Sequence, residues 1–274
     1  MVCRTNDIAL ARFYDVTKHD QTHIEAVAEL IRAGQVRAVS RLITRLENGE
    51  PDGSAVLRLL GKDVSGARVI GITGYPGAGK STLIDGLIGG YRRVGKKVGV
   101  LAVDISSPVT GGAVLGDRVR MQDHAGDPMV YIRSMASRGQ GGGLARTTHD
   151  AAKVLKAAGY DVILIETIGV GQSEIDIANV AQVVVAVVAP GLGDEVQAMK
   201  AGLLEVADIV VVNKSDLPGA DAALKNLRAW CRAVLPVASV NGTGIPQLMA
   251  AIAEQRTSKV SNSQSVDSKT VPSR

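Results

Sequence analysis

Aromatic residues are scarce in this chain of 274 residues, since Phe, Trp and Tyr together make up 3% of it. This scarcity argues against a nucleic-acid interface in which bases stack on aromatic rings. Charge of one sign is also lacking: 31 basic and 27 acidic side chains leave a net charge of +4. So small a surplus indicates neither a nucleic-acid partner nor a membrane partner.

Cysteines are few, and long apolar runs are missing. Cys3 and Cys231 are too far apart for a CxxC metal site and too few for a disulfide framework. The longest apolar run, Val183 to Pro190, is far shorter than the ~18 residues that a membrane span needs. Residues 1–14 carry charges and show no secretory signal. We therefore expect a soluble cytoplasmic protein with two free thiols.

Apolar residues spaced by three and four positions between Ile24 and Leu46 predict a helical hairpin that breaks at Gly34. After a turn over 48–53, a short helix is predicted at Ala55 to Leu60. From residue 67 on, short apolar runs alternate with helical patterns, which predicts strand–helix crossovers and a mainly parallel sheet. The predicted strands are Val69–Thr73, Val98–Asp104, Val130–Ile132, Val162–Glu166, Val183–Val188, Ile209–Asn213 and Val234–Ser239.

Residues 74–81, GYPGAGKS, match the pattern G-x-x-x-x-G-K-[ST] between a predicted strand and a predicted helix. Glycines let backbone N–H groups surround a phosphate, and the helix N-terminus adds its dipole. We expect Lys80 to reach the terminal phosphates, Ser81 to bind Mg²⁺ and Thr82 to lie near the α-phosphate. A Gly-rich turn without a ligand is the alternative. The expected phosphate-binding residues are Gly74, Gly77, Ala78, Gly79, Lys80, Ser81 and Thr82.

A second motif predicts which base is bound. Residues 213–216 match N-K-x-D at the end of another predicted strand. The Asp216 carboxylate can accept hydrogen bonds from guanine N1–H and the exocyclic amine, which adenine lacks there. A buried carboxylate left unpaired by the wrong base discriminates by ~10⁴ or more. Asn213 is expected to hold the base edge and its own loop, and the Lys214 stem to cover the ring.

The predicted strand that ends at Glu166 is followed by Gly169 three positions later. In this pattern the acid, Glu166, acts on Mg²⁺ and the backbone N–H of Gly169 senses the γ-phosphate. The alternative is an acid at the end of a strand followed by an ordinary Gly turn. Small regulatory GTPases carry a water-orienting Gln next, where this chain has Val170. We therefore expect slow hydrolysis unless another group or a partner supplies that function.

Two further acids are candidates for Mg²⁺ or its waters. Asp104 ends a predicted strand and Asp117 lies in a Gly-rich segment, but either could instead be a turn or helix cap. Four arginines could offset phosphate charge, although each is more often a surface ion-pair partner. They are Arg118, Arg120, Arg133 and Arg138.

The sequence thus predicts an α/β fold of the P-loop GTPase type, with a doubly wound, mainly parallel sheet. We expect an N-terminal helical segment over 1–60, the GTPase domain over 61–254 and a disordered tail over 255–274, where six serines gather. The expected cofactors are GTP or GDP and Mg²⁺.

Taken together, these motifs resemble those of the GTPase chaperones of adenosylcobalamin-dependent methylmalonyl-CoA mutase, the MeaB type, also called ArgK or LAO/AO transport ATPase. The resemblance covers about residues 24–253. The segments that carry it are 74–82, 104–121, 133–139, 142–145, 166–174, 190–195 and 213–216.

The resemblance implies GTP, Mg²⁺ and a complex in which the nucleotide state gates cofactor loading and protects the mutase. It makes Lys80, Ser81, Asp104, Asp117 and Glu166 the phosphate and magnesium set. It also makes 191–200, with Lys200, a further switch region, where spacing alone would suggest an ordinary polar loop.

The chain departs from the family pattern at three places. Ile105 replaces a common Pro, and Ser239-Val240 stands where a Ser-Ala pair usually contacts guanine O6 through the backbone. The resemblance also implies a homodimer, but the family continues into a helical dimerisation arm, whereas the last residues here are Ser-rich. The alternative function is a metal-delivery GTPase for another metalloenzyme, for which Cys or His clusters would be expected. A kinase or transport ATPase conflicts with residues 213–216.

Overall fold

The computed structural model describes residues 21–61, 66–104, 124, 126–136, 147–167, 174–191 and 203–255. Three of the predicted site residues, Asp117, Gly169 and Lys200, lie outside these ranges, as does the predicted tail beyond Gln255. No helix among the described residues is long and apolar enough to cross a membrane.

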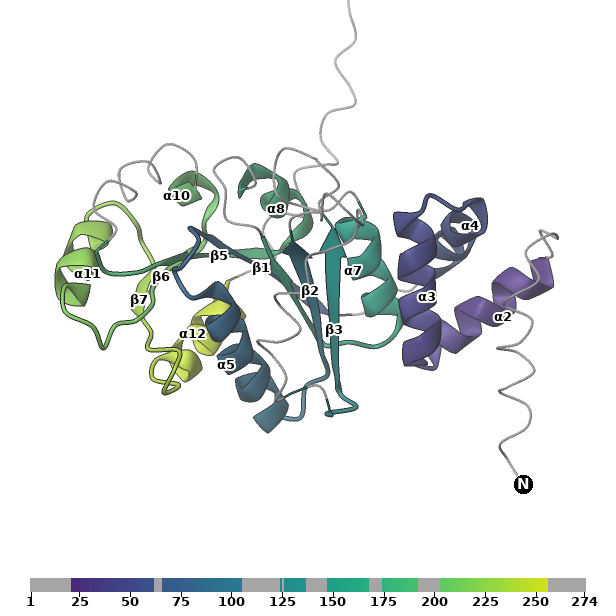
Figure 1. Cartoon of the computed structure of the whole chain (residues 1–274), viewed down its shortest axis with the longest axis horizontal. Coiled ribbons are helices and arrows are strands. Elements are labelled where there is room, and N and C mark those ends of the chain that lie inside the picture. Colours follow the sequence, from purple (N-terminus) through teal and green to yellow (C-terminus); the bar gives the residue numbers. More distant parts are fainter. Residues whose placement is uncertain are drawn as a thin grey trace, which may run out of the picture.

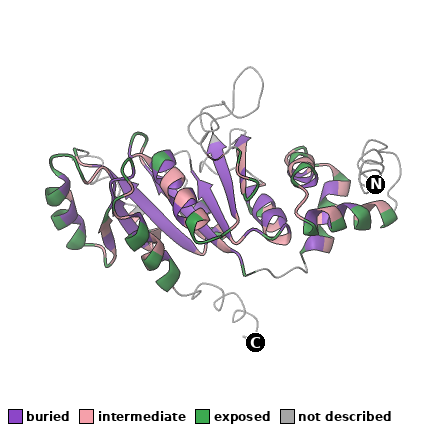
Figure 2. Ribbon diagram, turned by 90° about the horizontal axis from the view of Figure 1, so that it is seen from below, coloured by how far each residue is buried: buried purple, intermediate pink, exposed green. Residues whose placement is uncertain are grey.

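Among the described residues, one sheet of seven strands has the order β3-β2-β4-β1-β5-β6-β7, and every pairing in it is parallel. The strands are β1 (Arg68–Gly74), β2 (Val98–Asp104), β3 (Val130–Ala136), β4 (Val162–Glu166), β5 (Val183–Val188), β6 (Ile209–Val212) and β7 (Val234–Pro236). The central strands are rich in Val and Ile and buried along their length, as strands covered on both faces must be (Figure 2).

Helices cover both faces of this sheet (Figure 1). The crossover and C-terminal helices are α5 (Lys80–Arg93), α7 (Thr148–Ala157), α8 (Glu174–Val180), α10 (Leu203–Val206), α11 (Ala220–Arg228) and α12 (Ile245–Glu254). Alternate residues along each strand point to opposite faces. Ile70 and Leu164 therefore pack with α5 and α12, whereas Val69 and Ile163 pack with α7 and α8.

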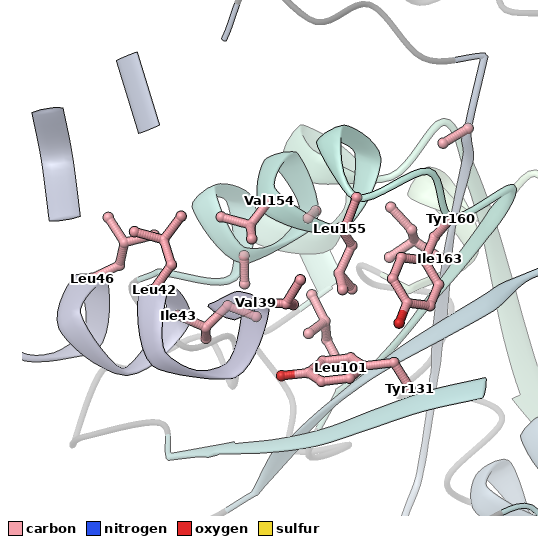
Figure 3. Close-up of a cluster of buried hydrophobic side chains, with 14 of the residues drawn as sticks. Val39, Leu42, Ile43, Leu46, Leu101, Tyr131, Val154, Leu155, Tyr160 and Ile163 are labelled. Carbon is pink, nitrogen blue, oxygen red and sulfur yellow. The ribbon is translucent and has the colours of Figure 1, made fainter. Parts of the chain in front are cut away.

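Three N-terminal helices continue the helical layer formed by α7 and α8 beyond the edge strand β3 (Figure 1). They are α2 (Gln21–Arg32), α3 (Val36–Glu47) and α4 (Pro51–Leu60). Figure 3 shows Leu42 and Ile43 of α3 beside Val154 and Leu155 of α7, and all four side chains are fully buried. The N-terminal helices therefore share one hydrophobic core with the sheet.

Polar contacts add to this packing at the sheet edge. Arg133 on β3 donates to the Ser40 carbonyl at 3.3 Å and to the Thr44 hydroxyl at 3.0 Å, and it pairs with the Glu47 carboxylate. The hydroxyls of Tyr131 and Ser40 lie 3.2 Å apart. Side-chain contacts thus link the edge strand β3 to α3.

Several element boundaries differ from the predicted ones. β3 runs to Ala136 rather than Ile132, because Arg133 breaks the apolar pattern but finds its partners on α3. β7 ends at Pro236, and only an isolated bridge between Ala238 and Thr243 lies beyond it. α4 begins inside the predicted turn, since Pro51 is favoured in the first turn of a helix.

Candidate functional site

The loop between β1 and α5 depends on backbone conformations that favour glycine. Gly74, Gly77 and Gly79 have φ values of 137°, 79° and 89°. A Cβ atom on Gly74 would collide with the carbonyl of Val187 on β5, and one on Gly79 would collide with the side-chain amide of Asn213. A Cβ atom at position 77 would meet nothing within 4 Å. Space and conformation thus both require glycine at 74 and 79.

Lys80 begins α5 and lies against the loop that precedes it. Its ammonium donates to the carbonyls of Gly74 at 2.8 Å and of Tyr75 at 3.2 Å, and the residue is only 8% exposed. An anionic phosphate oxygen is a stronger acceptor for an ammonium than a neutral carbonyl. A bound phosphate could therefore replace these carbonyls as the acceptor, and the role of Lys80 in phosphate binding stays a prediction.

Ser81 and Glu166 meet across two elements. The Ser81 hydroxyl donates to Glu166 Oε1 at 2.8 Å, and both residues are buried. β1 and β4 are neighbours, with Ile72 paired to Glu166, so the end of β4 lies beside the root of the loop. Adjacent ligands of an octahedral Mg²⁺ with bonds of ~2.1 Å lie ~3 Å apart. The separation and the oxygen chemistry of this pair therefore fit a magnesium site.

Asn213 joins three loops. Its amide nitrogen donates to the carbonyls of Ala78 at 2.9 Å and Gly79 at 3.2 Å. Its amide oxygen accepts from the Ser239 backbone N–H at 3.2 Å and from the Ser239 hydroxyl at 2.7 Å. The sequence predicted that Asn213 holds a base and its own loop, but it did not predict the bonds to the phosphate loop. These bonds fix the distance between the candidate phosphate and base subsites.

The remaining base-binding candidates lie around Asn213. Lys214 has a φ of 54° and is the one non-glycine residue with positive φ among the described residues. Such backbone strain is typical of functional positions. Asp216 is exposed, so a bound base would be needed to enclose its carboxylate. Ser239 is 8% exposed, whereas Val240 after it is 89% exposed.

Asp104 ends β2, two residues beyond Ala102, which is paired with Glu166 on β4. The backbone thus brings Asp104 to the same carboxyl edge of the sheet as Glu166. The prediction that Arg133 offsets phosphate charge is wrong, because its guanidinium contacts Ser40, Thr44 and Glu47 on α3. The other three arginine candidates lie outside the described residues. Within the described part of the chain, no group of three His, Cys, Asp or Glu side chains could hold a metal ion.

Comparison with known proteins yields one family. Residues 39–270 match the sequence model of the family described as "Methylmalonyl Co-A mutase-associated GTPase MeaB". A putative GTPase of Pyrococcus horikoshii is 48% identical over 246 residues, which cover 85% of this chain and 78% of that protein. The GTPase ArgK of Escherichia coli is 35% identical over 257 residues, with coverages of 87% and 77%.

Solved structures agree with this result. The crystal structure of an LAO/AO transport system kinase superposes with a TM-score of 0.66 at 27% identity, and covers 88% of this chain and 77% of that one. The hydrogenase maturation factor HypB of Archaeoglobus fulgidus has a TM-score of 0.54 at 20% identity, which shows a common fold alone. The predicted family and the predicted α/β fold are therefore confirmed, and the chain belongs to the MeaB family of P-loop GTPases.

Proposed function

We propose that this GTPase binds Mg²⁺ and GTP at the carboxyl edge of its sheet and couples the nucleotide state to the loading of adenosylcobalamin into methylmalonyl-CoA mutase. The description of the matched family names that mutase as the associated enzyme. A relative from Caenorhabditis elegans, 36% identical over 218 residues, is named a methylmalonic aciduria type A homolog. The family match is the observation that supports the mutase as partner.

The nucleotide part of the proposal is supported by the bonds of Asn213 to the phosphate loop and to Ser239. In this proposal Lys80 neutralises the terminal phosphates, Asp216 accepts hydrogen bonds from guanine, and the Lys214 stem covers the ring. In this proposal the Ser239 backbone contacts guanine O6. Gly77, Ala78, Gly79 and Thr82 complete the phosphate subsite.

Mg²⁺ would be held by Ser81 and Glu166, together with Asp104 and Asp117 directly or through water. When bound, the ion neutralises charge that develops on the phosphates during hydrolysis. In this proposal the backbone N–H of Gly169 would donate to the γ-phosphate, and the segment that contains Lys200 would transmit the presence of that phosphate to the mutase. The alternative of metal delivery to another metalloenzyme rests only on the fold shared with HypB.

Cofactor transfer tests this proposal directly. Cofactor-free mutase is mixed with adenosylcobalamin and the GTPase, and its activity is followed with GDP, with a non-hydrolysable GTP analogue and without nucleotide. We expect the rate of activation to depend on the nucleotide with the parent chain. The Lys80→Ala variant, which cannot hold the terminal phosphates, should remove that dependence. Equal activation under all three conditions would contradict the proposal.

A further inference from the structure

Two threonine hydroxyls are buried at the ends of the strands that carry the candidate site. Thr73 is 0% exposed and Thr167 is 1% exposed. Neither hydroxyl has a hydrogen-bond partner among the described residues. Buried hydroxyl groups in folded proteins nearly always have a partner, so this pair requires an explanation.

The two threonines are neighbours across the sheet. β1 and β4 pair in parallel with Ile72 opposite Glu166. The backbone N–H of Thr167 donates to the Ile72 carbonyl at 3.1 Å, which continues the ladder by one step. Thr73 and Thr167 are therefore the next two residues to lie opposite each other, after the pair of Ile72 and Glu166.

Their side chains also lie on the same face. Val69 on β1 and Ile165 on β4 belong to the core under α7 and α8. Side chains two positions apart on a strand point to the same side. Thr73 and Thr167 therefore both face this layer, opposite to Glu166, whose carboxylate meets Ser81.

We propose that Thr73 and Thr167 bind one ordered water molecule between them and act as positioning residues for GTP hydrolysis. The two strands lie ~4.8 Å apart, and the hydroxyls do not bond to each other, which would need a separation of ~2.8 Å. One water, bonded to both hydroxyls, spans that distance. Buried waters of this kind commonly satisfy polar groups that no protein atom reaches.

The water links the two chain segments that hydrolysis must align. Thr73 directly precedes Gly74, where the phosphate loop begins, and Thr167 directly follows Glu166. A displacement of about 1 Å at a reacting centre can cost about a hundredfold in rate. This inference rests on the proposed function, in which GDP is held by the backbone N–H groups of the phosphate loop and by residues 213–216 rather than by the two threonine side chains. The pair should therefore affect the rate of hydrolysis more than the affinity for GDP.

Isosteric variants test the inference. Thr73→Val and Thr167→Val replace the hydroxyl by a methyl group of similar size, whereas Thr167→Ser keeps the hydroxyl. We expect each Val variant to slow single-turnover GTP hydrolysis about tenfold, as loss of one buried hydrogen bond in the transition state would. The affinity for GDP should stay nearly unchanged, and the Ser variant should keep the parent rate. The double Val variant should be no slower than either single one, because both lose the same water.

Other outcomes would overturn the inference. Hydroxyls that are simply unsatisfied would make the Val variants unfold at a higher temperature than the parent, with unchanged hydrolysis. Losses that multiply in the double variant would show that the two hydroxyls act independently. A Ser variant as slow as the Val variant would assign the effect to packing. Thermal unfolding of every variant shows whether each one is folded.

Discussion

The hydroxyl of Ser81 donates a hydrogen bond of 2.8 Å to the carboxylate of Glu166, 85 residues further along the chain. The bond joins the first turn of α5 to the last residue of β4, and it is possible because β1 and β4 are paired. The candidate magnesium ligands are therefore brought together by the fold itself. Such preorganisation reduces the cost of ordering the site when the ion and nucleotide bind.

Replacing Glu166 by Gln tests this pair. The amide keeps an oxygen that can accept from Ser81 but removes the charge that a divalent cation requires. We expect the Mg²⁺ concentration for half-maximal hydrolysis to rise about 10- to 100-fold. GDP affinity measured in EDTA should match the parent. An unchanged Mg²⁺ dependence would exclude Glu166 from the metal site.

Guanine selectivity depends on Asp216. The parent chain should bind GDP much more tightly than ADP, because the carboxylate accepts from two donors that adenine does not present together. In Asp216→Asn, the amide N–H₂ would face the guanine N1–H and exocyclic amine, which are donors as well, so the preference for GDP should fall. Calorimetric titration with GDP and ADP measures both affinities. Equal affinities in the parent would refute the assignment of the base.

Two glycine variants distinguish the effect of a steric clash from the effect of a positive φ angle alone. Gly79→Ala places a methyl group against Asn213, so we expect loss of nucleotide binding as the phosphate loop is displaced. Gly49 has a φ of 71°, but a Cβ atom there would meet nothing within 4 Å. Gly49→Ala should therefore lower the free energy of unfolding by about 1 kcal/mol, the cost of a left-handed conformation for a residue with a Cβ atom, and leave GDP affinity intact. Equal effects of both variants on GDP binding would contradict this account of the loop.

Acid should weaken the contact between α5 and the chain before β3. Asp127 accepts from Arg92 Nε at 2.7 Å and from the Met129 backbone N–H at 2.8 Å, and these bonds, that of Arg92 foremost, lower the pKa of its carboxyl. A lowered pKa means that the unfolded state binds the proton more readily. The stabilisation is therefore present above about pH 4, the ordinary pKa, and is lost as the pH falls through the lower folded-state value.

Urea unfolding across that acid range measures this effect. The free energy of unfolding of Asp127→Asn should decrease less steeply with falling pH than that of the parent. Identical slopes for the two proteins would show that Asp127 contributes nothing to the acid dependence.

The sequence predicted those parts of the site that local chemistry determines. Gly79 and Lys80 belong to a motif in which turn conformation and helix start are encoded within eight residues, and the structure has both where the motif predicts. The ends of β2 and β4 were also predicted, because the apolar runs stop at the carboxyl edge of the sheet, and β1 ends one residue later than predicted, at Gly74. The roles of all the predicted site residues stay predictions, and Asp117, Gly169 and Lys200 also lie outside the described residues.

Long-range contacts could not be predicted from sequence spacing. Asn213 and Ala78 are 135 residues apart, and nothing local to either residue shows that their loops touch. Arg133 and Glu47 are 86 residues apart, so Arg133 was a candidate phosphate ligand until its partner on α3 was known. Both contacts depend on the strand order and on helix packing, which only the assembled fold supplies.

GTP hydrolysis with and without the mutase tests the central claim, that this GTPase is coupled to that enzyme. Val170 stands where small GTPases have a water-orienting Gln, so the isolated chain should hydrolyse GTP at about 10⁻⁴ to 10⁻² s⁻¹. Adding methylmalonyl-CoA mutase should raise this rate, and Lys200→Ala should reduce the increase while leaving GDP affinity nearly unchanged. The same rate with and without the mutase, or several turnovers per second by the isolated chain, would contradict the account.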